Sequence, residues 1–302
     1  MVIRRVLLDA FGTIFSPREP VHAQYARIGR SYGLPVADDD VKSAFKKAFK
    51  QWAASHPLYG KQSRPPLDPT DWWRSVIVDT FRFSGVAPSQ LDPVSARLAE
   101  ELVQRFWGTE GYALHEDFEP FLRGLHAMPE PQAAGSSRSD SPPRSRLFPP
   151  PVVVSNTDPA LLKILDSLGV SETGFEPPQA GVQHAQVYTT WHLEEDKKDV
   201  RFWEEVLRRL RLSDAAEENE GQAELLPSEV LVVGDELVSD YETPRRAGFR
   251  TLLLRRDTPS GEHARASYED EKDGLADVET VKDLIEVLDK IRHENSRRPT
   301  SS

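Results

Sequence analysis

Four short runs of uninterrupted apolar residues are the feature that most constrains the fold of this 302-residue chain. They read VLL at 6–8, VVV at 152–154, VLVV at 230–233 and LLL at 252–254. A strand with a continuous apolar run is typically buried on both of its faces, as strands of parallel sheets are. Because segments with helical periodicity lie between the runs, they indicate a doubly wound parallel sheet of the α/β class.

A block of helical patterns separates the first apolar run from the second. Four segments in it show helical periodicity, with acids or Pro-Asp signals at their starts and glycine at several ends. They read VHAQYARIGRSYG, DDDVKSAFKKAFKQWA, PTDWWRSVIVDTFRFSG and DPVSARLAEELVQRFWG. Four helices in a row without a strand predict a helical bundle inserted into the α/β domain, with Trp72 and Trp73 packing in its interior.

These patterns define the expected domain boundaries. The α/β core comprises residues 1–15 and 112–290, and the helical bundle comprises residues 16–111. Within the core, AQVYTTWHL is a weaker strand, DVRFWEEVLRRLRL is a helix and VETVKDLIEVLDKIRH is the closing helix. We expect disorder where the composition is Ser/Pro-rich or acidic and at the chain end, at about 129–149, about 213–227 and 291–302.

Composition excludes several classes of function. The formal net charge of −11 disfavours nucleic-acid binding, which requires a basic face. The chain has no cysteine, so disulfides, thiol catalysis and zinc-thiolate sites are excluded. The first apolar stretch is too short for a signal peptide, and no run is long enough to span a membrane. We therefore expect an intracellular protein, cytoplasmic or nuclear, without a membrane or nucleic-acid partner; the oligomeric state stays open.

Polar side chains follow the apolar runs at the points where the strands end. In an open parallel sheet, ligands bind beyond the carboxyl ends of the strands. The groups expected there are Asp9, Ser155, Asn156, Asp235 and Asp240, with Lys197 in the connection after the weak strand. Oxygen ligands suit Mg²⁺, and a lysine offsets the charge of a phosphate. The sequence therefore predicts a site for a phosphoryl group and Mg²⁺.

Asp235 is hard to explain structurally, but each of the other residues also has a purely structural interpretation. Asp9 and Asp240 are typical helix N-caps, and Ser155-Asn156 suits a capping turn. Lys197 lies in the charged run EEDKKDVR, which is typical of a solvated helix start. The convergence of all of them on one edge of the sheet favours the functional interpretation.

Four segments carry a resemblance to a known family. DAFGTI, VVSNTD, KKDVRFW and VVGDELVSDYETPRRAG resemble, in order and spacing, the four motifs of the haloacid dehalogenase-like (HAD) hydrolase superfamily. YGLPV, HPLYG and DWWRSVIVDTF are similar to the group around haloacid dehalogenase-like hydrolase domain-containing protein 3. The resemblance implies a Rossmann-like doubly wound parallel sheet, with the helical block as an inserted four-helix cap domain.

The resemblance also implies catalytic roles. Asp9 matches the nucleophile, which attacks phosphorus and forms an aspartyl-phosphate. Water then hydrolyses this intermediate. Ser155 matches the hydroxyl that binds the transferring phosphoryl oxygens, and Asn156 supports the same turn. Lys197 matches the cation that offsets charge on the nucleophile and the phosphate. Because the usual Lys-Pro-Asp-Pro pattern is absent, Lys198 is the alternative for this role.

A metal site is implied in the same way. Asp9, the backbone carbonyl of Phe11 and the carboxylate of Asp235 match the ligands of Mg²⁺. Asp240 matches a further ligand or a partner of the ligands. Phosphoryl transfer depends mostly on such positioning and charge neutralisation.

Phe11 is the main departure from the family pattern. Most family phosphatases have an aspartate there, which protonates the leaving group and activates water. Family dehalogenases often have an aromatic residue there but work without metal and usually lack the acid that matches Asp235. We therefore expect a Mg²⁺-dependent hydrolase of a small phosphorylated metabolite, weak or selective. The alternatives are a catalytically impaired protein that binds or regulates a partner and a 2-haloacid dehalogenase.

Overall fold

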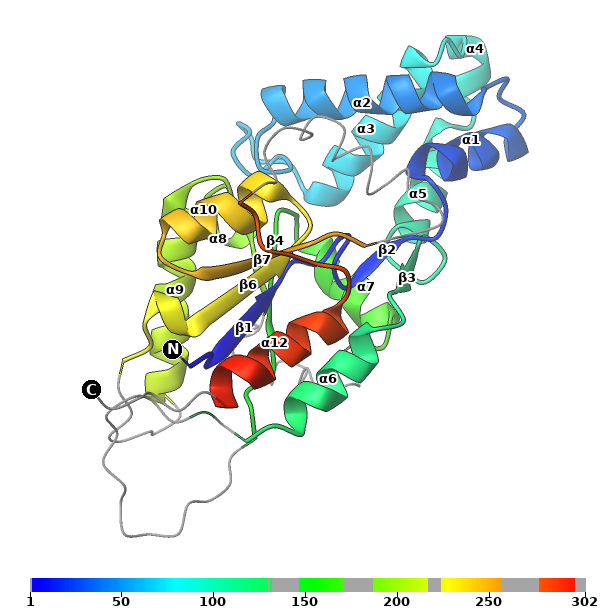
Figure 1. Ribbon diagram of the computed structural model, residues 1–302. Helices are drawn as coiled ribbons and strands as arrows, with labels where there is room; N and C mark the ends of the chain where they lie inside the picture. Colours follow the sequence, from blue (N-terminus) through cyan, green and yellow to red (C-terminus); the bar gives the residue numbers. More distant parts are fainter. Residues whose placement is uncertain are drawn as a thin grey trace. The chain divides into compact units, whose positions relative to one another are not determined.

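The computed structural model describes residues 2–129, 131, 147–170, 187–216, 224–256 and 277–296 (Figure 1). The chain forms two compact units. The core unit comprises Met1–Ser16, Leu114–Asn156 and Val170–Ser302, and the helical unit comprises Pro17–Ala113 and Thr157–Gly169. No helix within the described residues is long and apolar enough to cross a membrane.

A six-stranded parallel sheet with the order β5-β4-β1-β6-β7-β8 forms the centre of the core unit (Figure 1). Its strands are β1 (Arg5–Leu8), β4 (Val152–Ser155), β5 (Val187–Thr189), β6 (Val230–Gly234), β7 (Arg250–Leu254) and β8 (Thr280–Val281). The doubly wound α/β fold expected from the sequence is confirmed. Because every strand runs in the same direction, all the carboxyl ends lie along one edge of the sheet.

Both faces of the central strands are buried, which explains their continuous apolar runs. Leu7, Val154 and Val232 belong to one hydrophobic cluster with Phe202 and Trp203, which lie on the helix Val200–Ala216. Successive side chains of a strand point to opposite faces. The residues between them therefore face the other side of the sheet, and they are equally buried: Val6, Leu8, Val153 and Val233 are at most 1% exposed.

Helices cover the two faces of this sheet. The longer ones are α6 (Phe118–His126), α9 (Val200–Ala216) and α12 (Leu284–Ser296). The shorter ones are α8 (Thr190–Leu193), the 3₁₀ turn Pro227–Glu229, the π-helical turn Leu237–Glu242 and α10 (Thr243–Arg246). Figure 1 shows α6 and α12 side by side, and Leu288 of α12 packs closely against Gly124 of α6.

The helical unit contains α1 (Val21–Ser31), α2 (Asp38–Ser55), α3 (Pro69–Phe83), α4 (Pro88–Leu91), α5 (Ser95–Arg105) and α7 (Ala160–Ser167). Local signals explain their starts. Asp68 caps α3 by accepting a hydrogen bond from the Thr70 amide at 2.7 Å, with Pro69 in the first turn. Three acids begin α2, where the helix dipole favours negative charge. Trp72 is 1% exposed inside this unit, as expected.

Residues 157–169 group with the helical unit, although they follow a core strand in sequence. Trp73 donates its indole N–H to Asp158 at 2.6 Å, and Lys163 lies 3.6 Å from the ring centre of Trp107. These side-chain contacts form only in the folded chain, so no periodic pattern in the sequence predicts them. The expected division at residues 15/16 and 111/112 therefore differs from the structure mainly in this segment.

Several element boundaries differ from the sequence-based expectations. The weak strand ends at Thr189, because Thr190–Leu193 forms α8, which the Thr189 hydroxyl caps. Helix α9 continues to Ala216 and α12 to Ser296, so these parts of the stretches 213–227 and 291–302 are helical rather than disordered. Two short strands, β2 (Phe15–Pro17) and β3 (Tyr112–Leu114), were not expected.

The expected disordered insertion at 129–149 is only partly within the described residues. Phe148 is 1% exposed and donates its amide to the Met128 carbonyl at 2.8 Å, so the end of this stretch is packed. The remaining expectations of disorder, at 130, 132–146, 217–223 and 297–302, lie outside the described residues.

Candidate active site

Asp9 stands at the centre of the carboxyl edge of the sheet. It directly follows β1, which lies between β4 and β6. Its backbone amide donates to the Val233 carbonyl of β6 at 2.9 Å. The main chain is therefore fixed where the side chain leaves the sheet, and the carboxylate is 8% exposed.

Lys197 joins two carboxylates of this edge. Its ammonium nitrogen lies 2.6 Å from Asp9 Oδ1 and 2.5 Å from Asp240 Oδ1, and it donates to the Val154 carbonyl at 3.1 Å. Its side chain is 1% exposed, whereas Lys198 is exposed. Of the two lysines that the sequence left open, Lys197 is therefore the one that reaches Asp9.

The turn after β6 holds Asp240 in place. Asp240 Oδ2 accepts a hydrogen bond from the Glu236 amide at 3.0 Å, while Oδ1 faces Lys197. Gly234 is required at the end of β6, because a Cβ atom there would lie 2.4 Å from Asp240 Cγ. The sequence VVGDELVSD thus folds so that Asp235 and Asp240 both reach the sheet edge.

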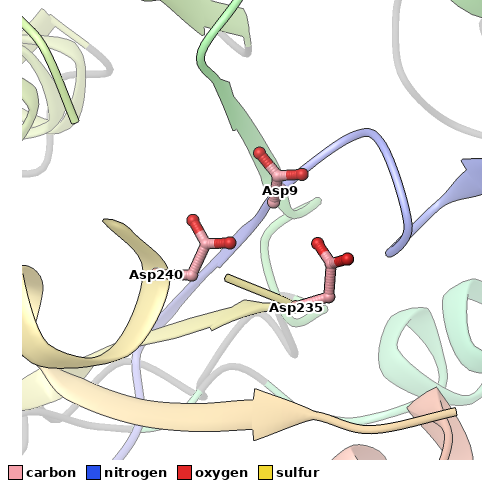
Figure 2. A group of neighbouring side chains, drawn as sticks. All are labelled: Asp9, Asp235 and Asp240. Carbon is pink, nitrogen blue, oxygen red and sulfur yellow. The ribbon is translucent and has the colours of Figure 1, made fainter. Parts of the chain in front are cut away.

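Three carboxylates converge at this point from three elements of the core unit. Figure 2 shows Asp9 after β1, Asp235 after β6 and Asp240 on the following helical turn, with their carboxylates pointing toward a common region. One oxygen of each lies within 4.8 Å of the others. Gly12, at φ +74°, allows Asp235 to approach the loop, since a Cβ atom there would lie 2.3 Å from Asp235 Oδ2.

The charges of this cluster are not balanced. Burial raises the pKa of Asp9 to about 7, with a smaller contribution from Asp240 and a partial offset by Lys197. Burial and then Asp9 and Asp240 raise the pKa of Asp235 well above its usual range. Burial opposes the charge of Lys197, but Asp240 and Asp9 outweigh it, so its pKa is raised. One ammonium thus stands against three carboxylates.

The raised pKa of Asp9 predicts a pH-dependent stability. Asp9 keeps its proton in the metal-free fold up to about pH 7, whereas its ordinary pKa is 3.8. Its contribution to stability is therefore present at low pH and lost as the pH rises through this window. Urea denaturation in EDTA should show wild type losing up to about 4 kcal/mol relative to Asp9→Asn between about pH 4 and pH 8. A pH-independent difference would contradict this assignment, and Mg²⁺ should reverse the loss.

The other expected site residues lie at the carboxyl ends of β4 and β1. Ser155 ends β4, next to β1, and is 1% exposed, whereas Asn156 beside it is exposed. Phe11 lies two residues after Asp9 and packs edge to face on Phe15, with ring centres 4.8 Å apart. A half-buried aromatic ring, which can neither donate nor accept a proton, therefore occupies the position two residues after Asp9.

Residues that support these loops were not expected from the sequence. Trp203 donates its indole N–H to the Lys197 carbonyl at 2.8 Å, which anchors the turn before α9. Arg255 and Arg256 donate to backbone carbonyls of the loops that carry Asp235 and Asp9. The only sequence signal for the arginines is their position directly after the apolar run of β7, at the same edge as the acids.

The chain is similar to several known proteins. A family model described as HAD-hydrolase-like matches residues 197–284. A putative uncharacterized hydrolase of Schizosaccharomyces pombe is 30% identical over 186 residues, which cover 58% of this chain and 69% of that protein. Haloacid dehalogenase-like hydrolase domain-containing protein 3 of Danio rerio is 28% identical over 255 residues, 84% of this chain and 86% of that protein. The crystal structure of the defluorinating L-2-haloacid dehalogenase Rha0230 has a TM-score of 0.59 at 18% identity, covering 96% and 95% of the two chains.

The parallel sheet, with the acid-lysine cluster at its carboxyl edge, defines a Rossmann-like α/β fold. The chain belongs to the haloacid dehalogenase-like hydrolase family. The resemblance drawn from the four sequence motifs is therefore confirmed. The likeness to the dehalogenase structure, at 18% identity, supports the fold alone.

Proposed function

We propose that this chain is a Mg²⁺-dependent hydrolase that cleaves small phosphorylated metabolites through a covalent phosphoryl group on Asp9. The observation that carries the proposal is the group of Asp9, Asp235 and Asp240, whose oxygens lie within 4.8 Å of one another around a single lysine. Such a concentration of buried negative charge is costly unless cations neutralise it.

The donor set fits Mg²⁺. All three side chains offer carboxylate oxygen, the ligand type that hard divalent cations prefer. We assign Asp9, Asp235 and the carbonyl of Phe11 as protein ligands, and Asp240 as a ligand or as the partner that holds Lys197. When bound, Mg²⁺ supplies positive charge against the phosphoryl oxygens and the nucleophile.

The protein's own residues perform the first step. Lys197 binds Oδ1 of Asp9, which orients the carboxylate and favours its ionised form against the effect of burial. Asp9 forms a bond to phosphorus as the bond from phosphorus to the ester oxygen breaks, and that oxygen leaves with the electron pair. Ser155, at the end of β4, is assigned to bind the phosphoryl oxygens, and Asn156 supports its turn. Water then attacks phosphorus as the bond from phosphorus to the Asp9 oxygen breaks; the released phosphate carries the protons of the water, and Asp9 is restored as a carboxylate.

Phe11 determines which esters this site can cleave. Its ring cannot protonate the departing oxygen in the first step or activate water in the second. General acid–base catalysis contributes about 10²–10⁴-fold in other enzymes. The proposed substrates are therefore phosphate compounds whose leaving group needs little protonation, such as aryl or acyl phosphates, and alkyl phosphates should be poor substrates.

The test of the proposed function is hydrolysis of p-nitrophenyl phosphate with Mg²⁺ and with EDTA. Activity that requires Mg²⁺ and is much lower with glycerol phosphate supports the proposal. Equal rates with Mg²⁺ and EDTA, at the level of the uncatalysed reaction, would contradict it.

Phe11→Asp is expected to raise hydrolysis of glycerol phosphate by about 10²-fold or more, because it restores an acid beside the nucleophile. Hydrolysis of p-nitrophenyl phosphate should rise much less, since its leaving group needs no proton. Phe11→Leu is the matched control, because it removes the ring contact with Phe15 without adding an acid. Steady-state kinetics on both esters measure the difference. Equal gains for the acid and the leucine variant would argue against this role of position 11.

The same residue favours a second candidate function. Halide needs no proton when it leaves carbon, so Phe11 is compatible with a 2-haloacid dehalogenase, whereas the carboxylate of Asp235 in the cluster opposes it. Release of halide from a 2-halo acid in EDTA would support this alternative. A protein that shows neither activity but forms a stoichiometric complex with a partner would instead be a binding or regulatory protein.

A further inference from the structure

Two adjacent arginines follow β7 and contact both loops of the candidate active site. Arg255 donates from Nη1 to the backbone carbonyl of Asp235. Arg256 donates from Nη2 to the Thr13 carbonyl at 2.8 Å and from Nε to the Gly12 carbonyl at 3.3 Å. One arginine therefore holds the loop that carries the metal-site acid, and the other holds the loop that follows the nucleophile.

The guanidinium of Arg256 is itself fixed. Its Nη1 donates to Asp117 Oδ2 at 2.8 Å, and the two side chains are only 11% and 13% exposed. The same oxygen of Asp117 accepts the amide of Leu284, the first residue of α12, at 2.7 Å. Arg256 is thus connected to the segment before α6 and to the start of α12, both of which belong to the core unit.

The two loops held by the arginines touch each other. The Cα of Gly12 approaches Asp235 so closely that a Cβ atom would lie 2.3 Å from its carboxylate oxygen. The carbonyl of Phe11, assigned above as a metal ligand, immediately precedes Gly12. A shift of either loop would therefore change the separation between this carbonyl and the carboxylate of Asp235.

We propose that Arg255 and Arg256 form an arginine clamp that sets the spacing of these two loops and thereby the affinity of the site for its divalent cation. The clamp acts through backbone carbonyls, so both arginines are positioning residues. Groups that orient metal ligands commonly change metal affinity or activity by about 10–100-fold when they are removed. The effect on metal affinity depends on the proposed function, whereas the restraint of the loop does not.

Hydrogen exchange tests the restraint directly. The amides of Gly12, Ile14 and Phe15 donate to carbonyls within their own loop. In Arg256→Gln these amides should exchange about tenfold faster than in wild type, because a charge-assisted anchor of the loop is lost. The matched control is Arg250→Gln, at the opposite end of β7, which removes an ion pair with Glu294. Exchange rates at Gly12–Phe15 that are the same in both variants would overturn the clamp.

Metal binding and kinetics test the effect of the arginine clamp on the metal affinity of the site. Mn²⁺, a spectroscopic substitute for Mg²⁺, should bind Arg256→Gln at least about tenfold more weakly than wild type, by titration followed with electron paramagnetic resonance. With metal at saturation, kcat on p-nitrophenyl phosphate should fall while KM changes little, since the clamp does not contact the substrate. Arg256→Lys should recover part of the affinity, because an ammonium reaches one carbonyl instead of two.

The outcomes separate this proposal from the proposed function. Wild type that binds no Mn²⁺ and hydrolyses no ester would contradict the proposed function, and the exchange measurement would still decide whether the clamp holds the loop. Wild type that binds Mn²⁺ with the same affinity as Arg256→Gln would overturn the clamp and leave the proposed function intact.

Discussion

Asp9→Asn is expected to lower Mg²⁺-dependent hydrolysis of p-nitrophenyl phosphate by at least about 10⁴-fold, since the amide oxygen is a poor nucleophile. The fold should survive, because Asn has the same shape and Lys197 keeps its contact with Asp240 at 2.5 Å. The loss should therefore be confined to kcat. Steady-state release of phosphate, with circular dichroism as a check of the fold, measures it.

A matched control separates the role of Asp9 from a general effect of removing a paired carboxylate. Asp214 on α9 pairs with Arg5 at the start of β1, at the end of the sheet opposite the site. Asp214→Asn should keep the wild-type rate within about a factor of two, as is usual for substitutions away from functional sites. A rate of Asp9→Asn within tenfold of wild type would rule out a covalent role for Asp9.

Lys197→Met is expected to destabilise the metal-free protein by about 3–5 kcal/mol near pH 8, because it leaves two buried carboxylates without their cation. Lys197 lies 2.6 Å from Asp9 and 2.5 Å from Asp240, and its side chain is 1% exposed. The penalty should shrink below about pH 5, where Asp9, with its raised pKa, is protonated. Urea denaturation at the two pH values measures the change.

The neighbouring lysine provides the control for this substitution. Lys198 is exposed, so Lys198→Met should change stability by less than about 0.5 kcal/mol at either pH. Hydrolysis should follow the same pattern, with a large loss for Lys197→Met and little change for Lys198→Met. Equal free energies of unfolding of the two variants at pH 8 would show that the contacts of Lys197 do not stabilise the protein.

The sheet and its central residues were predictable from local sequence. Continuous apolar runs are required where both faces of a strand are buried, so β1, β4, β6 and β7 were visible without a structure. Asp9 and Asp235 follow such runs directly, and the carboxyl ends of parallel strands lie at one edge. Short elements carried no comparable signal: β8 contains two residues and is defined by its pairing with β7.

Other parts of the site depend on tertiary contacts that the sequence does not encode locally. Lys197 and Lys198 are equivalent in a charged run, and the turn anchored by Trp203 decides which of them reaches Asp9. Arg255 and Arg256 donate to backbone carbonyls of residues that are distant in sequence. Because every residue type has a backbone carbonyl, the sequence gives no sign of these contacts. Asp158 follows β4 in sequence but accepts a hydrogen bond from Trp73 within the helical unit.

We propose that the cluster of Asp9, Asp235 and Asp240 binds a divalent cation and that Asp9 hydrolyses phosphate compounds. Release of inorganic phosphate from a broad panel of phosphate esters and acyl phosphates, with Mg²⁺, with EDTA and with Asp9→Asn, tests it most directly. We expect Mg²⁺-dependent release that is confined to compounds with good leaving groups and absent in Asp9→Asn. Background rates across the whole panel, identical for wild type and Asp9→Asn, would contradict it.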